Sequence, residues 1–344
     1  MRATVLNDKA LAKQAGRFVW LSIDTEDSKN AAFLEQYPWE AVPTFDVIDP
    51  KIEKIAYSWI GAVDLAGLLA RFDEAESAFR RTDAVAAAAP STADAEVLAL
   101  ALAGKNEECA LKALELLPGL PPGSVKASVA ATGLDCALSS PEKTKWRGTA
   151  LVILEVTTHE ALAYDGLLDD DRAGLYASFV DARDRQHDDA GAKARAAEWV
   201  TWLNAQAMSA PSVEARAALD GFRVSAALRA GTPELVLSAI EASERDLPND
   251  YNPPARLATV LRELGRYDEA LAASDRALAK VYGPRTIRLW EDRATIFEKK
   301  GDPENVKSAL RRAIDFAATL PASERTKRTI ARLEKRLGQV GRPG

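Results

Sequence analysis

Apolar positions return every three or four residues along most of this chain, and a strand-like pattern is confined to its N-terminal part. In that part, the helical spacing predicts helices over residues 4–14, 30–37 and 65–79. Short runs of β-branched and aromatic residues predict strands over residues 18–24, 44–49 and 55–60. From Ser91 onward no strand-like alternation is present, so the remainder is predicted to be helix after helix.

The turns between consecutive C-terminal helices recur at a nearly constant interval. The clearest turn is Leu-Gly-Arg-Tyr at residues 264–267, where the glycine permits a tight turn and the small Ala270 behind it allows helices to cross closely. Gly301 lies 36 residues after Gly265, and Gly231 lies 34 residues before Gly265. This pattern resembles the tetratricopeptide repeat, whose period is about 34 residues.

Other stretches fit the repeat less well. Gly104 heads a weak copy, and the helix before Gly231 places Asp220 and Arg223 where the repeat buries apolar side chains. Residues 140–210 are predicted to be helical but show no clear repeat phase. The resemblance implies a solenoid whose first helices line a groove for a protein or peptide partner. The contact residues that it implies are Asn252, Thr259, Arg262, Arg288, Glu291 and Thr295.

Three helix starts share a local signature. An oxygen-bearing side chain precedes a proline and then a glutamate, as expected for an N-cap followed by proline at the first helical position. The three tripeptides begin at Ser140, Thr232 and Asp302.

The order of elements in the first eighty residues is helix, strand, helix, strand, strand, helix. Together with the Val42-Pro43-Thr44 turn and the Asp49-Pro50 hairpin, this order resembles the thioredoxin fold from its redox helix onward. The resemblance implies a cis-proline at Pro43 and binding of an extended substrate by Val42 and Pro43. It also implies a Cys-x-x-Cys site, but no cysteine precedes this turn. Two explanations stay open: the redox cysteines lie upstream of Met1, which we favour, or the segment is a non-catalytic remnant.

Composition and charge limit the remaining functions. The chain has 344 residues and a net charge of −6 from 45 basic and 51 acidic residues, which gives no nucleic-acid footprint. The last 21 residues are locally basic and are interpreted as the solvated face of a terminal helix. No run is long and apolar enough for a membrane span, and no secretory signal is visible, which favours the cytoplasm and leaves the periplasm open if a signal precedes Met1.

Few residues suggest other chemistry. Cys109 and Cys136 are interpreted as inert, buried thiols. His159 and His187 show no metal-ligand spacing, so no metal or cofactor is predicted. Trp199 and Trp202 are interpreted as helix-packing anchors on one helix.

The predicted fold class is α/β plus all-α, a partial thioredoxin-like fold followed by an α-helical tetratricopeptide-like solenoid. The predicted segments are residues 1–80, a linker at 81–91 and a repeat domain at 92–344, with the clearest repeats at 251–284 and 286–320. No catalytic residue is assigned. The function that this implies is thiol–disulfide exchange by cysteines outside the chain, with a non-catalytic protein-binding adaptor as the alternative. The oligomeric state is not indicated.

Overall fold

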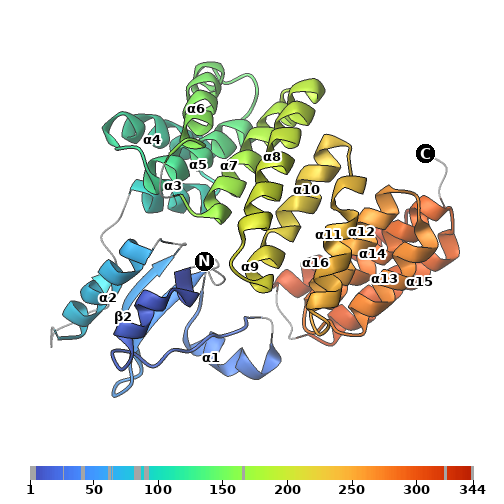
Figure 1. Ribbon diagram of the computed structural model, residues 1–344, viewed down its shortest axis with the longest axis horizontal. Helices are drawn as coiled ribbons and strands as arrows, with labels where there is room; N and C mark the ends of the chain where they lie inside the picture. The colour runs from blue at the N-terminus through green and yellow to red at the C-terminus, as the bar shows by residue number, and fades with distance from the viewer. Residues whose placement is uncertain are drawn as a thin grey trace. The chain divides into compact units, whose positions relative to one another are not determined.

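The computed structural model divides into two compact units. One contains Met1–Val19 and Pro38–Gln206, and the other contains Trp20–Tyr37 and Ala207–Gly344. The structure describes residues 5–25, 27–39, 43–60, 63, 65–80, 87–88, 93–164, 167–320 and 324–341. Most of these residues are α-helical, and the strands belong to the first unit (Figure 1). The units are called unit 1 and unit 2 below.

The N-terminal part of unit 1 is a small sheet with one covering helix. Strands β1 (Thr44–Asp49) and β2 (Lys54–Ile60) pair antiparallel, and β3 (Ala87–Ala88) adds a short parallel bridge to β2. Helix α2 (Leu65–Arg80) packs against β2. Their shared core contains Tyr57, Trp59, Leu68, Phe72 and Ala75, because the apolar face of α2 meets the apolar side of β2. The predictions of these two strands and of α2 are confirmed.

Two N-terminal predictions are wrong. Residues 18–24 form no strand, and Val19 and Leu21 are 90% and 72% exposed. An apolar run becomes a strand only when a neighbouring strand pairs with it, and no described strand lies beside this one. The first helix is instead two short 3-10 helices, η1 (Val5–Asn7) and η2 (Lys9–Gln14). The described residues therefore show a hairpin, a bridge and a helix, and no thioredoxin fold.

The helical part of unit 1 is built around one central helix. Helix α5 (Ser124–Ser139) is contacted by α3, α4, α6 and α7 and by the short helix η4. The cluster around it includes Val97, Leu134, Ala137 and Leu154, all completely buried. The bounds are α3 (Ala93–Leu102), α4 (Asn106–Leu116), η4 (Leu117–Gly119), α5 (Ser124–Ser139), α6 (Arg147–Ala161), α7 (Asp169–Arg185) and α8 (Asp189–Ser209).

The two cysteines join α4 to α5. Cys109 and Cys136 form a disulfide with a Cα–Cα distance of 6.1 Å, and both are buried. The prediction of free thiols is therefore wrong, although their burial in the core is confirmed. The 27-residue spacing of the two cysteines does not by itself indicate that α4 and α5 pack side by side there.

Of two local predictions in unit 1, the packing role of the tryptophans is confirmed and the helix start at Ser140 is wrong. Trp199 and Trp202 of α8 pack against Tyr176 of α7, with ring centroids 6.3 and 5.6 Å apart, which confirms their packing role. Ser140 starts no helix: it ends α5, and its hydroxyl donates to the Cys136 carbonyl at 2.9 Å. The next helix begins only at Arg147.

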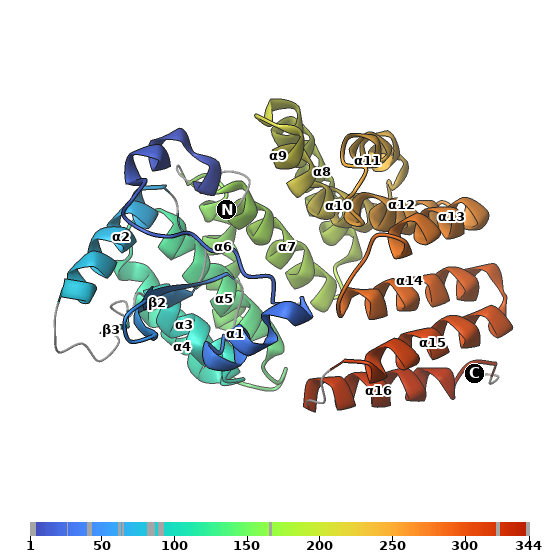
Figure 2. The ribbon, with the colours of Figure 1, turned by 90° about the horizontal axis from the view of Figure 1, so that it is seen from below.

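Unit 2 is a row of helices in which sequence neighbours pack together. Figure 2 shows α14, α15 and α16 running side by side, and the preceding helices continue the same succession. The core of α14–α16 contains Ile287, Leu310, Ala313 and Leu333. The bounds are η3 (Ser28–Asn30), α1 (Ala31–Gln36), α9 (Val213–Ala218), α10 (Asp220–Ala230), α11 (Glu234–Asp246), α12 (Asn252–Glu263), α13 (Tyr267–Leu278), α14 (Arg285–Lys300), α15 (Pro303–Ala318) and α16 (Glu324–Leu337).

The turn glycines confirm the repeat. Gly231, Gly265 and Gly301 each follow a helix and have φ values of 76°, 73° and 78°. Gly104, which heads the weak copy in unit 1, has φ 70°. This left-handed conformation is costly for residues with a Cβ atom, so the spacing of the glycines marks the spacing of the helix pairs.

The charged residues predicted at core positions of α10 are indeed buried. Asp220 is fully buried, Arg223 is 8% exposed, and they form an ion pair at 3.1 Å. Arg256 of α12 lies nearby: it donates to the Ala217 carbonyl at 3.1 Å, and burial lowers its pKa while Asp220 opposes that shift. The misfit to the repeat is thus compensated by charge pairing.

Candidate functional site

The predicted partner-binding residues lie on two helices of unit 2 that contact each other. Asn252, Thr259 and Arg262 belong to α12, and Arg288, Glu291 and Thr295 belong to α14. On α12 these groups bond locally: Asn252 donates to Asp250 at 2.8 Å, Thr259 to the Ala255 carbonyl at 3.3 Å, and Arg262 to Glu263 at 2.7 Å.

On α14, two of the predicted residues are engaged by the last helix. Arg332 of α16 makes an ion pair with Glu291 at 2.5 Å, and Arg336 donates to Thr295 at 2.9 Å. Arg336 also pairs with Glu298 at 2.9 Å. The basic C-terminal segment is therefore more than a solvated face, since two of its arginines hold α16 against α14. Arg288 differs, with a side chain 85% exposed and a long 3.9 Å contact to Asp292.

A narrow crevice separates α12, α13 and α14 beside these residues. Thr259, Arg262 and Asp292 line it, and its volume is about 10 Å³. Burial raises the pKa of Asp292, while Arg288 and Arg262 act in the opposite direction. A crevice of this size has room for about one water molecule, so a side chain of a partner does not fit without rearrangement.

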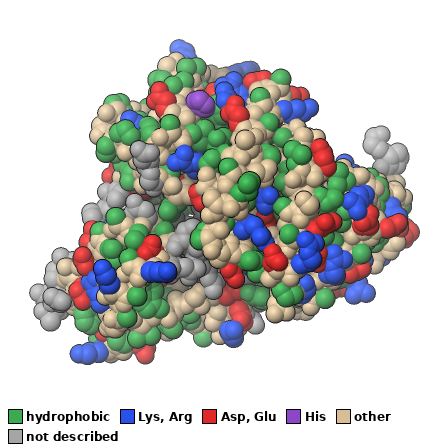
Figure 3. Space-filling model, viewed as in Figure 1, with side chains coloured by type: hydrophobic (Ala, Val, Ile, Leu, Met, Phe, Trp, Pro, Cys, Tyr) green, Lys and Arg blue, Asp and Glu red, His purple; other side chains and the backbone are tan. Residues whose placement is uncertain are grey.

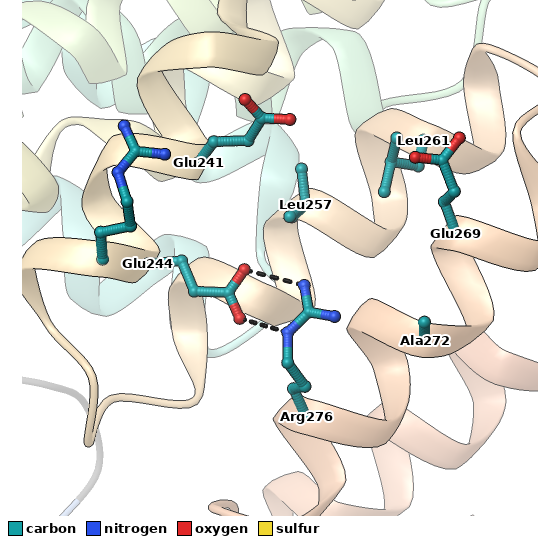
Figure 4. A pocket seen from close by; sticks show the side chains of 8 residues that line it. Glu241, Glu244, Leu257, Leu261, Glu269, Ala272 and Arg276 are labelled. Carbon is teal, nitrogen blue, oxygen red and sulfur yellow. Dashed lines mark hydrogen bonds and ion pairs between the residues drawn. The ribbon is translucent and has the colours of Figure 1, made fainter.

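A larger cleft lies between α11, α12 and α13, and the sequence did not point to it. Its volume is about 350 Å³, and Leu257 and Leu261 of α12 lie between flanking residues of α11 and α13 (Figure 4). Both leucines are nearly buried, at 5% and 4% exposure, so they form an apolar floor. The full lining is Glu241, Glu244, Arg245, Leu257, Leu261, Glu269, Ala272 and Arg276.

An ion pair crosses this cleft. Arg276 of α13 donates to both carboxylate oxygens of Glu244 on α11, at 2.6 and 2.9 Å (Figure 4). The hydrogen bonds from Arg276 hold the pKa of Glu244 below its ordinary value. Glu269 is similarly held by Arg266, at 2.7 and 2.6 Å.

Glu241 differs from Glu244 and Glu269, the other two glutamates that line the cleft. No hydrogen bond or ion pair joins it to another residue in the described part of the chain, and its side chain is partly exposed. The sequence signal that could have revealed the cleft is the pair of glutamates one turn apart on α11 facing the small Ala272 of α13. This pair of glutamates predicts a cleft only when the packing of α11 beside α13 is already known.

The predicted substrate-binding pair at the N-terminus stays a prediction. Val42 lies outside the described residues, and Pro43 forms a bend directly before β1. No side chain with redox chemistry lies among the described residues of that segment, since both cysteines of the chain are in the disulfide between α4 and α5.

Neither histidine belongs to a metal site in the described ranges. His159 packs against Phe179 with a centroid distance of 5.3 Å, and His187 lies in the turn after α7. Among the residues that the structure describes, no group of three His, Cys, Asp or Glu side chains is placed to hold a metal ion. Within the same residues, every helix is too short or too polar to cross a membrane.

Acidic and basic side chains intermingle over the C-terminal helices. On the face in Figure 3, red and blue side chains alternate there without a large area of one sign. Such a surface suits specific contacts better than a long-range field.

Comparisons with known proteins give little beyond this geometry. No family model matches the chain, and a search of curated proteins finds no relative. Among solved structures it is similar to a tetratricopeptide repeat protein from Parabacteroides merdae ATCC 43184, with 14% identity and a TM-score of 0.37, over 78% of this chain and 93% of that one. It is also similar to a chain of the APC/C hetero-tetramer Cut9–Hcn1, with 11% identity and a TM-score of 0.26, over 78% of this chain and 52% of the other. These scores carry no argument about function. What the coordinates themselves establish is a mostly α-helical, tetratricopeptide-like repeat protein with a small β-hairpin near its N-terminus.

Proposed function

We propose that this chain is a non-catalytic protein-binding scaffold whose contacts are made by the stacked helices of unit 2. One observation carries the proposal: the stack leaves a cleft of about 350 Å³ with an apolar floor at its surface. Stacked helix pairs in general present extended surfaces of this kind to proteins or peptides.

The partner surface that we propose has two parts. One is the cleft between α11, α12 and α13, and the other is the predicted set on α12 and α14, of which Arg288 extends furthest into solvent. Glu291 and Thr295 are less suited to partner contacts because α16 already engages them.

Thiol–disulfide exchange is the less favoured function. Exchange requires an accessible thiolate, and Cys109 and Cys136 are buried in a disulfide within the core of unit 1. We therefore expect the full chain, supplied with dithiothreitol, to leave the rate of insulin reduction at its background value. Turnover above that background would contradict the scaffold proposal.

The binding proposal is tested by site-specific photocrosslinking in an extract of the source organism. A photoreactive amino acid replaces Ala272 in the cleft, Arg288 on α14 or, as a control, the exposed Lys145 in unit 1. We expect a discrete adduct with the same protein from position 272 or 288 and none from 145. Equal labelling from all three positions, or no adduct at all, would refute a specific partner surface.

A further inference from the structure

We infer that this chain is a substrate of a thiol–disulfide exchange enzyme, which oxidises Cys109 and Cys136 before helices α4 and α5 pack around them. The inference goes beyond the proposed scaffold function and does not depend on it. The chain receives the disulfide from the enzyme and is not itself the catalyst. Its folding then takes place in an oxidising compartment.

The two sulfurs lie in the core of unit 1. Cys109 of α4 is 0% exposed and Cys136 of α5 is 3% exposed. Ala110, Leu134 and Ala137 belong to the same cluster and are completely buried. Exchange requires that an attacking thiolate reach one sulfur of the bond, so access limits its rate. An enzyme therefore cannot reach either sulfur while unit 1 is packed.

Helices α4 and α5 approach each other closely beside the disulfide. A Cβ atom at Gly133 of α5 would lie 2.4 Å from the Cβ of Ala113 on α4. Gly133 comes three residues before Cys136, and Ala113 comes four residues after Cys109, so this close approach is about one helical turn from the bond. Packing of α4 on α5 and access of a second protein to the sulfurs thus exclude each other, and oxidation has to come first.

Oxidation of the two thiols removes two electrons and two protons, so it needs an electron acceptor. In the step that we propose, the thiolate of one cysteine attacks a disulfide of the enzyme, which forms a mixed disulfide and releases one enzyme thiolate. The thiolate of the other cysteine then attacks the first cysteine's sulfur in this mixed disulfide. The Cys109–Cys136 bond forms and the second enzyme thiolate leaves. The enzyme's disulfide is thereby reduced to a dithiol, which takes up the two protons.

The same bond indicates the compartment. Thiol reductants keep cysteines reduced in the cytosol, whereas secretory compartments and the bacterial periplasm contain enzymes that form disulfides. The chain has only two cysteines, so the pair has no alternative partner within the chain and one exchange cycle completes the product. We therefore expect oxidation during folding in such a compartment, and not in the cytoplasm that the sequence favoured.

The first test measures the oxidation state in cells of the source organism. After a rapid acid quench, a maleimide joined to polyethylene glycol adds a fixed mass to each free thiol, so the full chain carries two labels when reduced and none when oxidised. We expect no label before reduction with dithiothreitol and two labels after it. A chain that carries two labels directly after the quench would refute the inference.

Cys136→Ala tests for the enzyme itself. In this variant Cys109 can form the mixed disulfide, but no second cysteine is left to resolve it, so a covalent adduct that dithiothreitol cleaves should accumulate. Mass spectrometry identifies the attached protein, and the test works even if the variant does not fold, because the enzyme acts on the unpacked chain. The control is Cys109→Ala with Cys136→Ala, which should give no adduct. No adduct from Cys136→Ala, or one only with proteins that lack a disulfide exchange site, would overturn the inference.

The order of oxidation and packing is tested on the purified, oxidised chain. Dithiothreitol should reduce the folded chain at least about 100-fold more slowly than the chain unfolded in urea, because reduction of the folded chain waits for unit 1 to open. Gly133→Ala, which disturbs the contact of α5 with α4, should accelerate reduction of the folded chain. Gly174→Ala, where nothing lies within 4 Å, is the matched control and should leave the rate unchanged. Equal rates for the folded and the unfolded wild type would show that packing does not shield the sulfurs, and the proposed order would be wrong.

Discussion

The helices of unit 1 and unit 2 are held together in different ways. In unit 1, α5 is surrounded by α3, α4, α6 and α7 and is joined to α4 by the Cys109–Cys136 disulfide. In unit 2, each helix packs mainly on its neighbours in sequence, and ion pairs link side chains of different helices that are 30 to 41 residues apart in sequence. These pairs are Arg216–Asp246, Glu244–Arg276, Asp268–Lys300 and Glu291–Arg332.

This difference predicts different sensitivities. A centred core with a covalent link depends on close packing and on the oxidation state of its sulfurs. A row of helices depends on the interface between each pair of neighbours, and its exposed ion pairs respond to salt and pH. Hydrogen exchange measured by mass spectrometry reports on unit 1 through peptides from α5 and on unit 2 through peptides from α13. The stability of each unit can therefore be followed separately.

The largest effect should come from removing the disulfide. In the oxidised chain, Cys109→Ala with Cys136→Ala should lower the free energy of unfolding of unit 1 by about 3–4 kcal/mol, because the bridge closes a loop of 27 residues. Exchange in α5 should accelerate, while exchange in α13 should stay as in the wild type. Reduction of the wild type should reproduce the effect, and the double variant should not respond to reductant. A reductant-insensitive wild type would show that the bridge does not form.

Packing around α5 gives the next largest effect. A Cβ at Gly133 would collide with Ala113 of α4 and lie 3.0 Å from Leu154 of α6, so Gly133→Ala should destabilise unit 1 by about 1–3 kcal/mol. The matched control is Gly174→Ala in α7, where nothing lies within 4 Å and the substitution should stabilise by about 0.5–1 kcal/mol. Thermal denaturation of both variants checks the pair. Equal behaviour would mean that α4, α5 and α6 are less closely packed than described.

In unit 2, the contact of α16 with α14 should have a smaller effect that depends on salt. Arg332→Gln removes the ion pair with Glu291, whose side chain is only 15% exposed, and should cost about 0.5–1 kcal/mol at low ionic strength. The loss should shrink in 1 M salt. Lys335→Gln on the same helix serves as the control, and urea unfolding measures both. If the two variants are equally stable, the ion pair contributes nothing to holding α16.

The smallest effect concerns pH. The pKa of Glu244 is lower in the folded state because of Arg276, so the stability from this pair is present above the unfolded value of about 4.3. It is lost as the pH falls through the lower, folded value. At pH 6, Glu244→Gln should therefore lower the free energy of unfolding by less than about 1 kcal/mol, which a slightly lower melting temperature than that of the wild type would show. Near pH 3 the two melting temperatures should converge. A constant difference across this range would show that the charge of Glu244 is not involved.

Local patterns in the sequence predicted much of the fold. The hairpin of β1 and β2, the helix α2 and the turn glycines 231, 265 and 301 follow from spacing along the chain. The strand expected at residues 18–24 was wrong because a strand needs a partner, which local pattern cannot supply. Ser140 was misread because Ser-Pro-Glu also occurs where a helix ends before a loop.

The features that were missed depend on which helices meet in space. The disulfide requires α4 beside α5, and the cleft requires α11 beside α13 with α12 between them. The residue pattern within a single helix indicates neither arrangement. The predicted partner residues on α12 and α14 are adjacent as expected, yet the sequence did not show that α16 would occupy two of them.

The buried Asp220–Arg223 pair constrains how this chain can diverge. Replacing either member alone would remove a counter-charge from a desolvated cluster, at a cost of about 3–5 kcal/mol, whereas exchanging both for apolar residues of similar volume is tolerated only if Arg256, which Asp220 also stabilises, is exchanged with them. The two positions are therefore epistatic, and a single-step mutational path between the charged and the apolar version crosses a fitness valley. Natural homologues of α10 should accordingly carry both charges or neither.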